Sequence, residues 1–468
     1  MVCPEDFHFT PKALFYLPNF GDGIVQLQKN GIVLMKKRSQ IFFPRPQIFW
    51  GIFLTFLIVR VGFVVFSGYN SFQLLPDTER YDRQSNEILA GHFNLTEPLF
   101  ITAPIYPYLE ALFKFLFGLY WILALQIAQI LISSLSGVYL YKTAQLIWRK
   151  EDIALTASAI YCFFPFTLWW VHTFSQEMLF QSFLIFTVYS FLKSIYKNDL
   201  LSLLVSAALF SVTFLTKSHI LLFALFIPII IFLLQNKNLK QSLGYTAVFT
   251  AVCFIFTIPY GLYNLKVNGQ YVISSTGLGA QFLLGHNDDA YLTIVNPPPY
   301  NSAEAVRLSK GDFLIFRQLA DEKQGLSQSQ LEKLYFNEGL RWCQENPQKA
   351  VTIALYDLYY FLMPGLNKNW YSQNQWLASI IISSPIYIFG YIGIFLSLKR
   401  DFKRHFWILA LFISMIIFSV GLYVQNRFRT ITLEPFYILY AAFCVSHLMN
   451  CIFHGHREDI IKFENIDG

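Results

Sequence analysis

The sequence predicts a polytopic α-helical membrane protein with about ten transmembrane helices. Of its 468 residues, 55% are hydrophobic and only 14% are charged, which excludes an ordinary soluble domain. Several apolar runs are long enough to cross a bilayer, and the short loops on one side of them are consistently basic. The expected spans cover residues 47–66, 121–147, 152–171, 175–196, 200–216, 219–235, 241–261, 376–398, 405–424 and 431–453.

The basic residues set the expected orientation, because positively charged short loops mark the cytoplasmic side of a membrane. With the N-terminus inside, every short loop on that side carries Lys or Arg, whereas the opposite short loops hold few charges. We therefore expect both termini to be cytoplasmic. A bacterial plasma membrane is the expected location, since the chain shows no large soluble appendix. The basic loop residues are Lys36, Lys37, Arg38, Arg149, Lys150, Lys193, Lys197, Lys237, Lys240, Lys399, Arg400, Lys403 and Arg404.

Two longer segments interrupt the spans, and both fall on the extracytoplasmic side of this topology. They divide the chain into a tail, a membrane module with a large first outer loop, a second outer region, the last transmembrane helices and a cytoplasmic tail. Residues 1–34 are unlike the rest, and we interpret them either as an extension upstream of a start at Met35 or as a disordered tail. The expected regions are 1–46, 47–261 (with the outer loop 67–120), 262–375, 376–453 and 454–468.

The first outer loop carries a polar stretch from Pro76 to Gly91. Pro76 and Asp77 are typical of a helix start, and Gly91 lies where that helix would end. Asp77 should therefore lie at the beginning of a short helix in the membrane interface. One interpretation gives it only a capping role, because Asp often accepts hydrogen bonds from free backbone N–H groups there. An amphipathic segment at 103–118 predicts a second interfacial helix.

The second outer region has a different pattern. Residues 263–288 are rich in β-branched residues and Gly, which predicts strand and turn. Amphipathic segments at 331–346 and 350–365 predict two further helices.

Four more polar residues lie on the expected outer side, near the ends of spans. Arg427 and Arg429 present planar guanidinium groups that fit phosphate oxygens, and Lys217 is a further cation there. Glu177 lies in a turn between two spans. Alternatively, Glu177 is only a solvated carboxylate in its turn. The three cations could likewise only extend to the lipid headgroups.

The sequence gives little support for a metal or nucleic acid. The six cysteines have no metal-ligand spacing, and no P-loop is present. Asp77 and Glu79 form a D-x-E pair that could hold a divalent cation. Because the chain already supplies cations, we expect no metal to be required, and we expect no nucleic-acid partner.

The stretch from Pro76 to Gly91 resembles the first outer loop of the GT-C class of polyprenyl-phosphate-sugar-dependent glycosyltransferases. The resemblance is to the protein O-mannosyltransferase and lipid A aminoarabinose transferase branch, and Asp77, Arg80-Tyr81 and Ala90-Gly91 carry it. The succession of family features continues from about residue 48 to about residue 453. The chain departs from the aminoarabinose branch at Thr102-Ala103, where that branch has an acidic and a basic residue.

The resemblance implies a GT-C-like fold and an inverting transfer of sugar from a polyprenyl-phosphate donor to an extracytoplasmic acceptor. It implies that Asp77 is the catalytic carboxylate and that Glu177 is the acidic turn residue close to it. A base near the acceptor and cations on the leaving phosphate are what this chemistry needs. The expected base is Asp77, with Glu79 or Glu177 orienting the acceptor. The expected substrate-binding residues are Arg80, Tyr81, Lys217, Arg427 and Arg429.

Two other functions remain open at this point. The first is a flippase or transporter of lipid-linked sugars, and the second is a non-catalytic relative with a binding role. Transporters usually have two matching halves with Gly- or Pro-broken helices. This chain has large outer loops, no matching halves, and its ionisable residues on one face, so an enzyme is favoured. The acceptor class stays open between a lipid, a glycan and a protein.

Overall fold

The structure is a computed structural model, and its two compact units are Met1–Ile48 and Phe49–Gly468. In the first unit, β1 (Ile24–Gln28) and β2 (Gly31–Met35) form an antiparallel hairpin. The disordered-tail interpretation of residues 1–34 does not account for this hairpin. Residues 1–23, and 455–468 of the expected cytoplasmic tail, lie outside the described residues. The structure describes residues 24–28, 31–35, 46–67, 76–97, 100–235, 238–299, 302–309, 313–319, 322, 324–368, 371–423 and 425–454.

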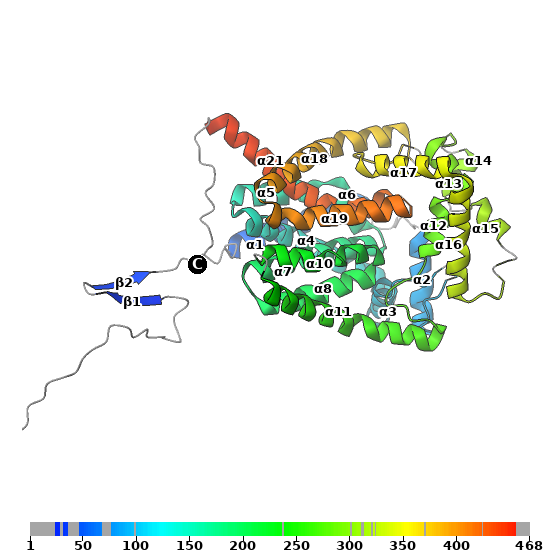
Figure 1. Cartoon of the computed structure of the whole chain (residues 1–468), viewed down its shortest axis with the longest axis horizontal. Helices are drawn as coiled ribbons and strands as arrows, with labels where there is room; N and C mark the ends of the chain where they lie inside the picture. The colour runs from blue at the N-terminus through cyan, green and yellow to red at the C-terminus, as the bar shows by residue number, and fades with distance from the viewer. Residues whose placement is uncertain are drawn as a thin grey trace, which may run out of the picture. The chain divides into compact units, whose positions relative to one another are not determined.

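The second unit is helical, and most of its long helices lie along roughly the same axis, whereas α2 and α16 lie across it (Figure 1). The membrane module comprises α1 (Pro46–Phe66), α2 (Pro76–Leu89), α3 (Ile105–Phe117), α4 (Trp121–Trp148), α5 (Glu151–Phe163), α6 (Pro165–His172), α7 (Gln176–Tyr196), α8 (Leu200–Thr216), α9 (Leu221–Ala224), α10 (Ile227–Leu234) and α11 (Leu239–Asn268), with 3-10 turns at Gly118–Tyr120 and Ser218–Ile220. The remainder comprises α12 (Leu278–Gly285), α13 (Asp288–Val295), α14 (Ala303–Ser309), α15 (Leu314–Gln318), α16 (Gln328–Glu345), α17 (Pro347–Leu362), α18 (Gln373–Arg400), α19 (Phe402–Gly421), α20 (Asn426–Thr432) and α21 (Glu434–His454).

All of the expected spans are helical, but ten full-length spans are not confirmed. Seven stretches in the described part of the chain are long and apolar enough to cross a membrane, or eight if the bent pair α5 and α6 forms one span. The helix α8 has only 17 residues. The run 219–235 is divided into α9 and α10, and Pro228 lies in the first turn of α10, where a proline is tolerated because it lacks only a free N–H.

The first outer loop forms the two helices that the sequence predicts. The helix α2 ends just before Gly91, whose φ of +88° belongs to the left-handed region that favours glycine. In α3, Leu112, Phe115 and Leu116 are exposed apolar side chains, as expected for a helix that lies in a membrane interface.

The strand predicted between residues 263 and 288 is wrong. The helix α11 continues through this segment to Asn268, a turn follows at Gly269, and α12 begins at Leu278. The β-branched residues Val272, Ile273 and Thr276 lie between the two helices, in a segment that forms no strand. Its backbone is held instead by single contacts, since Asn264 donates to the carbonyl oxygen of Val272 at 2.8 Å and the N–H of Thr276 donates to that of Ile101 at 3.1 Å. At Gly285 a Cβ would lie 1.9 Å from the carbonyl oxygen of Leu422, so only glycine lets α12 approach the end of α19 this closely.

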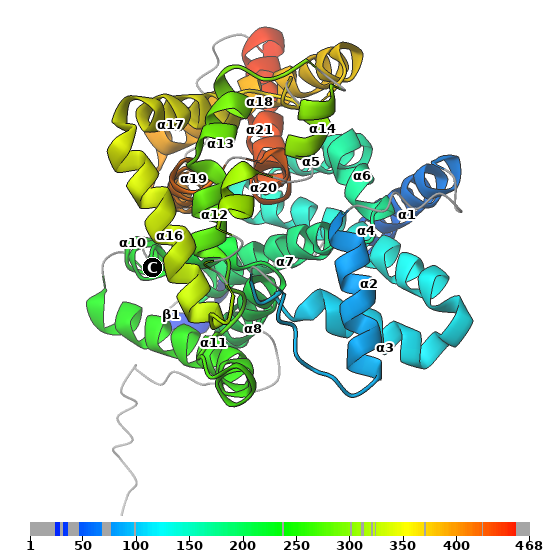
Figure 2. The ribbon, with the colours of Figure 1, turned by 90° about the vertical axis from the view of Figure 1, so that its right-hand side faces the viewer.

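The outer helices gather at one end of the second unit. Figure 1 shows α2 and α12 to α16 together at that end, and Figure 2 faces it, with α7 and α20 visible between α2 and α16. At the other side of the core, α18 packs closely on α21. A Cβ at Gly393 would lie 2.1 Å from the carbonyl oxygen of Tyr440, so small residues permit this contact.

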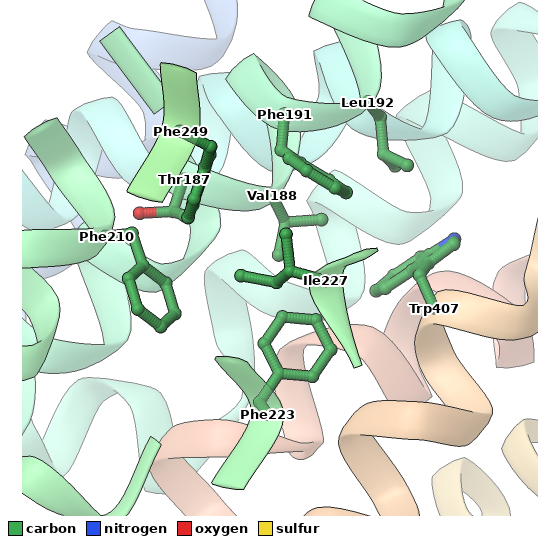
Figure 3. Close-up of a pocket in the computed structure, with 9 residues that line it drawn as sticks. All are labelled: Thr187, Val188, Phe191, Leu192, Phe210, Phe223, Ile227, Phe249 and Trp407. Atoms are coloured by element: carbon green, nitrogen blue, oxygen red, sulfur yellow. The ribbon is translucent and has the colours of Figure 1, made fainter. Parts of the chain in front are cut away.

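A small apolar pocket lies in the core among α7, α8, α9, α10, α11 and α19 (Figure 3). Its volume is about 10 Å³, which is close to the minimum for a single water molecule. Aromatic rings such as Phe191, Phe210 and Phe249 line it. It has neither the size nor the polar groups to hold a sugar phosphate.

The helix α17 carries a buried carboxylate. The side chain of Asp357 is 0% exposed, and neither of its oxygens has a hydrogen-bond partner in the described part of the chain. Burial therefore raises the pKa of Asp357 to about 8, so this carboxyl group is protonated at neutral pH.

We predict that the outer loops react with an impermeant thiol reagent in intact cells. The expected sites are Asn94→Cys and Gln344→Cys, both at exposed positions, in a background without the exposed native Cys451. Lys399→Cys, at the opposite end of a span, should react only after lysis. Protection of Asn94→Cys or Gln344→Cys in intact cells would contradict the topology.

A second prediction concerns pH. The folded state retains the proton of Asp357 between its ordinary pKa near 4 and about 8, whereas the unfolded state releases it. The contribution of this group to stability therefore decreases as the pH rises through that window. Thermal unfolding from pH 5 to 8 should show a smaller loss of stability in Asp357→Asn than in the wild type. Glu345→Gln, an exposed control, should retain the wild-type pH dependence of stability. If wild type and Asp357→Asn lose stability equally between pH 5 and 8, Asp357 is not the group that retains its proton.

Candidate functional site

Four segments converge at the end of the unit where α2 and α16 lie: the start of α2, the start of α7, the residue after α8, and α20 (Figure 2). The helix α2 is fixed to the loop before α7, since the hydroxyl of Thr78 donates to the carbonyl oxygen of Phe174 at 2.8 Å. One turn further, Tyr81 is fully buried and its ring packs on that of Tyr106 at 4.9 Å between centroids. These contacts position Asp77 in the first turn of α2.

Asp77 forms ion pairs with two arginines. Its Oδ2 accepts a hydrogen bond from Nη1 of Arg427, which is 350 residues away in the sequence. Its Oδ1 lies 3.0 Å from Nη2 of Arg80. Because Asp77 lies within the helix and its carboxylate pairs with side chains, a capping role does not describe it.

Glu177 and Lys217 form the other half of the cluster. Nζ of Lys217 donates to Oε1 of Glu177 at 2.7 Å, and Nη1 of Arg427 lies 3.5 Å from the same oxygen. Arg427 therefore links the two carboxylates. The second oxygen of Glu177, Oε2, is buried and has no hydrogen-bond partner among the described residues. It is an acceptor that a bound hydroxyl or ammonium group could satisfy.

The cluster is partly open to solvent. The side chain of Arg427 is 33% exposed and that of Asp77 is 18% exposed, whereas Glu177 is 1% exposed and lies beneath them. Counting Arg80, Lys217 and Arg427 against Asp77 and Glu177, three cations face two carboxylates. One positive charge remains, which favours an anionic ligand.

The cations also control the protonation of Asp77. Burial alone would raise the pKa of Asp77, but Arg427 and then Arg80 and Lys217 lower it below the ordinary value. The pKa of Arg427 is raised, because Asp77 and Glu177 outweigh its burial. For Lys217, burial dominates over Glu177 and lowers the pKa. With Arg427 in this position, Asp77 is a carboxylate and a weak base at neutral pH.

Residues that sequence reasoning missed hold α20 in place. The side chain of Gln425 accepts a hydrogen bond from Nε of Arg427 at 2.5 Å. The side chain of Gln181 in α7 donates to the carbonyl oxygen of Thr430 at 3.1 Å, and His219 contacts the hydroxyl of Thr432 at 3.0 Å. Gln425 and His219 each lie two residues from a cation that the sequence singles out, and this proximity was the available signal.

Arg429 does not join the cluster, and we correct its expected substrate-binding role. It is 1% exposed, and its guanidinium donates to the carbonyl oxygens at the end of α17 and in the loop that follows. The acceptors are Tyr360, Phe361, Met363 and Gly365. Because Arg427 and Arg429 are two residues apart on a helix, they face different sides. The two terminal nitrogens of Arg429 are occupied by backbone, whereas its Nε has no hydrogen-bond partner among the described residues and lies 3.9 Å from Oε1 of Glu434. These buried contacts indicate a structural role.

Two further expectations change at α2. Glu79 is exposed and, being two residues from Asp77, faces a different side of the helix, so the structure does not bring it into the cluster. The two carboxylates of the D-x-E pair therefore do not face one common position. In the described part of the chain, no group of three or more His, Cys, Asp or Glu could hold a metal ion. The phenol of Tyr81 is buried, and it accepts from Arg80 at 3.3 Å, which indicates a positioning role.

Comparison with known proteins gives a family match over part of the chain. Residues 101–263 match the family model described as dolichyl-phosphate-mannose-protein mannosyltransferase. No curated protein matches the chain significantly.

Two solved structures of one oligosaccharyltransferase share its fold. The oligosaccharyltransferase of Archaeoglobus fulgidus tethered with an acceptor peptide is 13% identical, with a TM-score of 0.52 over 87% of this chain and 51% of that chain. The same protein in complex with zinc and sulfate is 13% identical, with a TM-score of 0.51 over 86% and 49%. The chain thus spans about half the length of these structures. ArnT from Cupriavidus metallidurans, bound to undecaprenyl phosphate, is 14% identical over 86% of this chain and 78% of that chain, with a TM-score of 0.38.

The chain therefore has the GT-C fold, and the family match confirms its resemblance to the polyprenyl-phosphate-dependent glycosyltransferases of that class.

Proposed function

We propose that the chain is a membrane-embedded inverting glycosyltransferase that moves a sugar from a polyprenyl-phosphate donor to an extracytoplasmic acceptor. The observation that carries the proposal is the cluster in which Arg427 links Asp77 to Glu177, with Lys217 beside it. The description of the matched family, which names dolichyl-phosphate-mannose, supports the donor class. The acceptor is a lipid, a glycan or a protein.

In the proposed reaction, the acceptor group gives its proton to the carboxylate of Asp77 and attacks the anomeric carbon of the sugar. The new bond forms as the bond from that carbon to the phosphate oxygen breaks, and polyprenyl phosphate leaves. Lys217 and Arg427 balance the charge that develops on the leaving phosphate. Water then takes the proton from Asp77. Since the cations come from the protein, no step requires a metal.

Arg427 makes the base dependent on the donor in this proposal. A lipid phosphate and Asp77 compete for the same guanidinium group, which prefers paired contacts with an anion. Once Arg427 turns to the phosphate, Asp77 loses its strongest partner, so its pKa increases toward the range of an effective base. The free oxygen of Glu177 then orients the acceptor.

The direct test is incubation of the purified protein with a panel of polyprenyl-phosphate sugars and candidate acceptors. Release of polyprenyl phosphate together with a glycosylated acceptor is the expected result. A lipid-linked-sugar flippase would move the donor across vesicles and leave the sugar-phosphate bond intact. Donor movement without bond cleavage would therefore refute the proposal.

The first prediction from this site concerns Asp77→Asn. This change keeps the size of the side chain but removes the proton acceptor, so turnover should decrease by about 10²–10⁴-fold. Donor affinity should not weaken, because Arg427 is released for the phosphate. Single-turnover kinetics and donor binding separate the two effects.

The matched control is Glu79→Gln, which alters an exposed carboxylate on the same helix and should retain turnover. If Asp77→Asn turns over at the wild-type rate, Asp77 is not the base, and Glu177 becomes the next candidate.

The second prediction contrasts the two arginines of α20. Arg427→Ala should weaken donor binding by about 2–5 kcal/mol, as expected for loss of one partner of a desolvated charge pair. Arg429→Ala should instead lower stability, because several buried carbonyl oxygens lose their donor, at about 1–3 kcal/mol per unsatisfied group. Donor titrations and unfolding curves measure both. Equal donor affinities for wild type and Arg427→Ala would exclude Arg427 from the phosphate site.

A further inference from the structure

A polar cavity lies at the end of the bundle opposite the Asp77 cluster. It has a volume of about 210 Å³ and is lined by the ends of α4 and α18, the start of α19, and α21. Figure 1 shows these helix ends far from α2 and α16. The polar residues that line it are Trp148, Ser397, Arg400, Asp401, Arg404 and His405.

The charges of this cavity favour an anion. Two guanidinium groups face one carboxylate, and Asp401 is already engaged, because its Oδ1 accepts from the backbone N–H of Arg404 at 3.1 Å and caps α19. The first turn of α19 adds the positive end of a helix dipole. Arg404 is held in place by its hydrogen bond to the carbonyl oxygen of Leu146 at 3.3 Å and by the ring of Tyr196 beneath it.

The wall of the cavity also contains donors that lack an acceptor. The indole Nε1 of Trp148 and the hydroxyl of Ser397 are buried and have no hydrogen-bond partner among the described residues. Unsatisfied buried donors are uncommon in folded proteins and are often explained by an ion or water that binds them. Cations together with unused donors match the oxygens of a phosphate group.

Size and stacking narrow the class of ligand. A volume of 210 Å³ exceeds what one water needs but is below the 300–1,000 Å³ typical of sites for drug-sized molecules. The ring of Trp148 is already stacked on Phe443 at 5.3 Å and on His405 at 6.0 Å. An indole that already stacks on two rings of the protein favours a phosphate on a small headgroup over a nucleotide.

We propose that this cavity binds the phosphate of an anionic membrane lipid. The sequence predicts that this end of the bundle is cytoplasmic, where anionic lipids gather and where basic pockets between transmembrane helices bind their headgroups. Arg400 and Arg404 supply the charge, and Ser397 and Trp148 supply the additional donors. The proposal is independent of the reaction at Asp77.

The test uses the purified full-length chain in detergent and follows its thermal unfolding midpoint. The probes are dioctanoyl phosphatidylglycerol, dioctanoyl phosphatidylcholine and inorganic phosphate, since a ligand that binds the folded state raises the midpoint. Phosphatidylglycerol should raise it more than phosphatidylcholine. Arg400→Gln and Ser397→Ala should each weaken phosphatidylglycerol binding by about tenfold or more, as expected for a hydrogen bond to a charged group.

The matched control is Lys399→Gln, which removes the same charge from an adjacent exposed residue outside the cavity and should bind as the wild type does. Arg400 is itself exposed, so its replacement should not prevent folding. Inorganic phosphate could also raise the unfolding midpoint as much as phosphatidylglycerol does, with both effects lost in Arg400→Gln. That result would support a phosphate site but would assign it to the free ion. Equal responses to the two lipids, or equal binding by Arg400→Gln and Lys399→Gln, would overturn the proposal.

Discussion

The ion pair between Asp77 and Arg427 is the contact on which the candidate site depends. It joins the first outer helix to the short helix before the last span, across 350 residues of sequence. Both groups are partly withdrawn from water, where an ion pair is stronger but an unpaired charge is more costly. The position of each is fixed by further contacts, through Thr78 on one side and through Gln425 and Thr430 on the other. The pair therefore fixes the position of α2 relative to α20 above Glu177.

The same interaction gives the proposed enzyme a way to limit its reaction to the bound donor. While Arg427 pairs with Asp77, the carboxylate is a poor proton acceptor, because the guanidinium group lowers its pKa. The phosphodiester of the donor is a competing anion with a single charge and two free oxygens that fit a planar fork, and its charge increases when polyprenyl phosphate leaves. Donor binding would thus complete the phosphate contact and activate the base in one step. Lys217 and Glu177, which are already paired with each other, keep the remaining charges balanced during the exchange.

Much of this arrangement could be predicted from the sequence, since composition, apolar run length and the bounds of α2 indicate the fold. Asp77, Glu177, Lys217 and Arg427 could be grouped because each is a polar residue at the outer end of an apolar segment. Sequence could not separate Arg427 from Arg429, because a helix of seven residues turns them to different sides and only the fold shows what each side meets. Glu79 was misplaced for the same reason. The false strand before α12 came from local propensity, whereas the segment is held by Asn264, which donates to the carbonyl oxygen of Val272, and by Ser274, which donates to that of Phe214.

The most direct test of the central claim is an experimental structure of the full chain with a polyprenyl phosphate bound in a lipid environment. The account predicts that the phosphate lies within hydrogen-bond distance of Lys217 and Arg427, and that the guanidinium of Arg427 has turned away from Asp77. A phosphate bound elsewhere, with the pair of Asp77 and Arg427 unchanged, would contradict it.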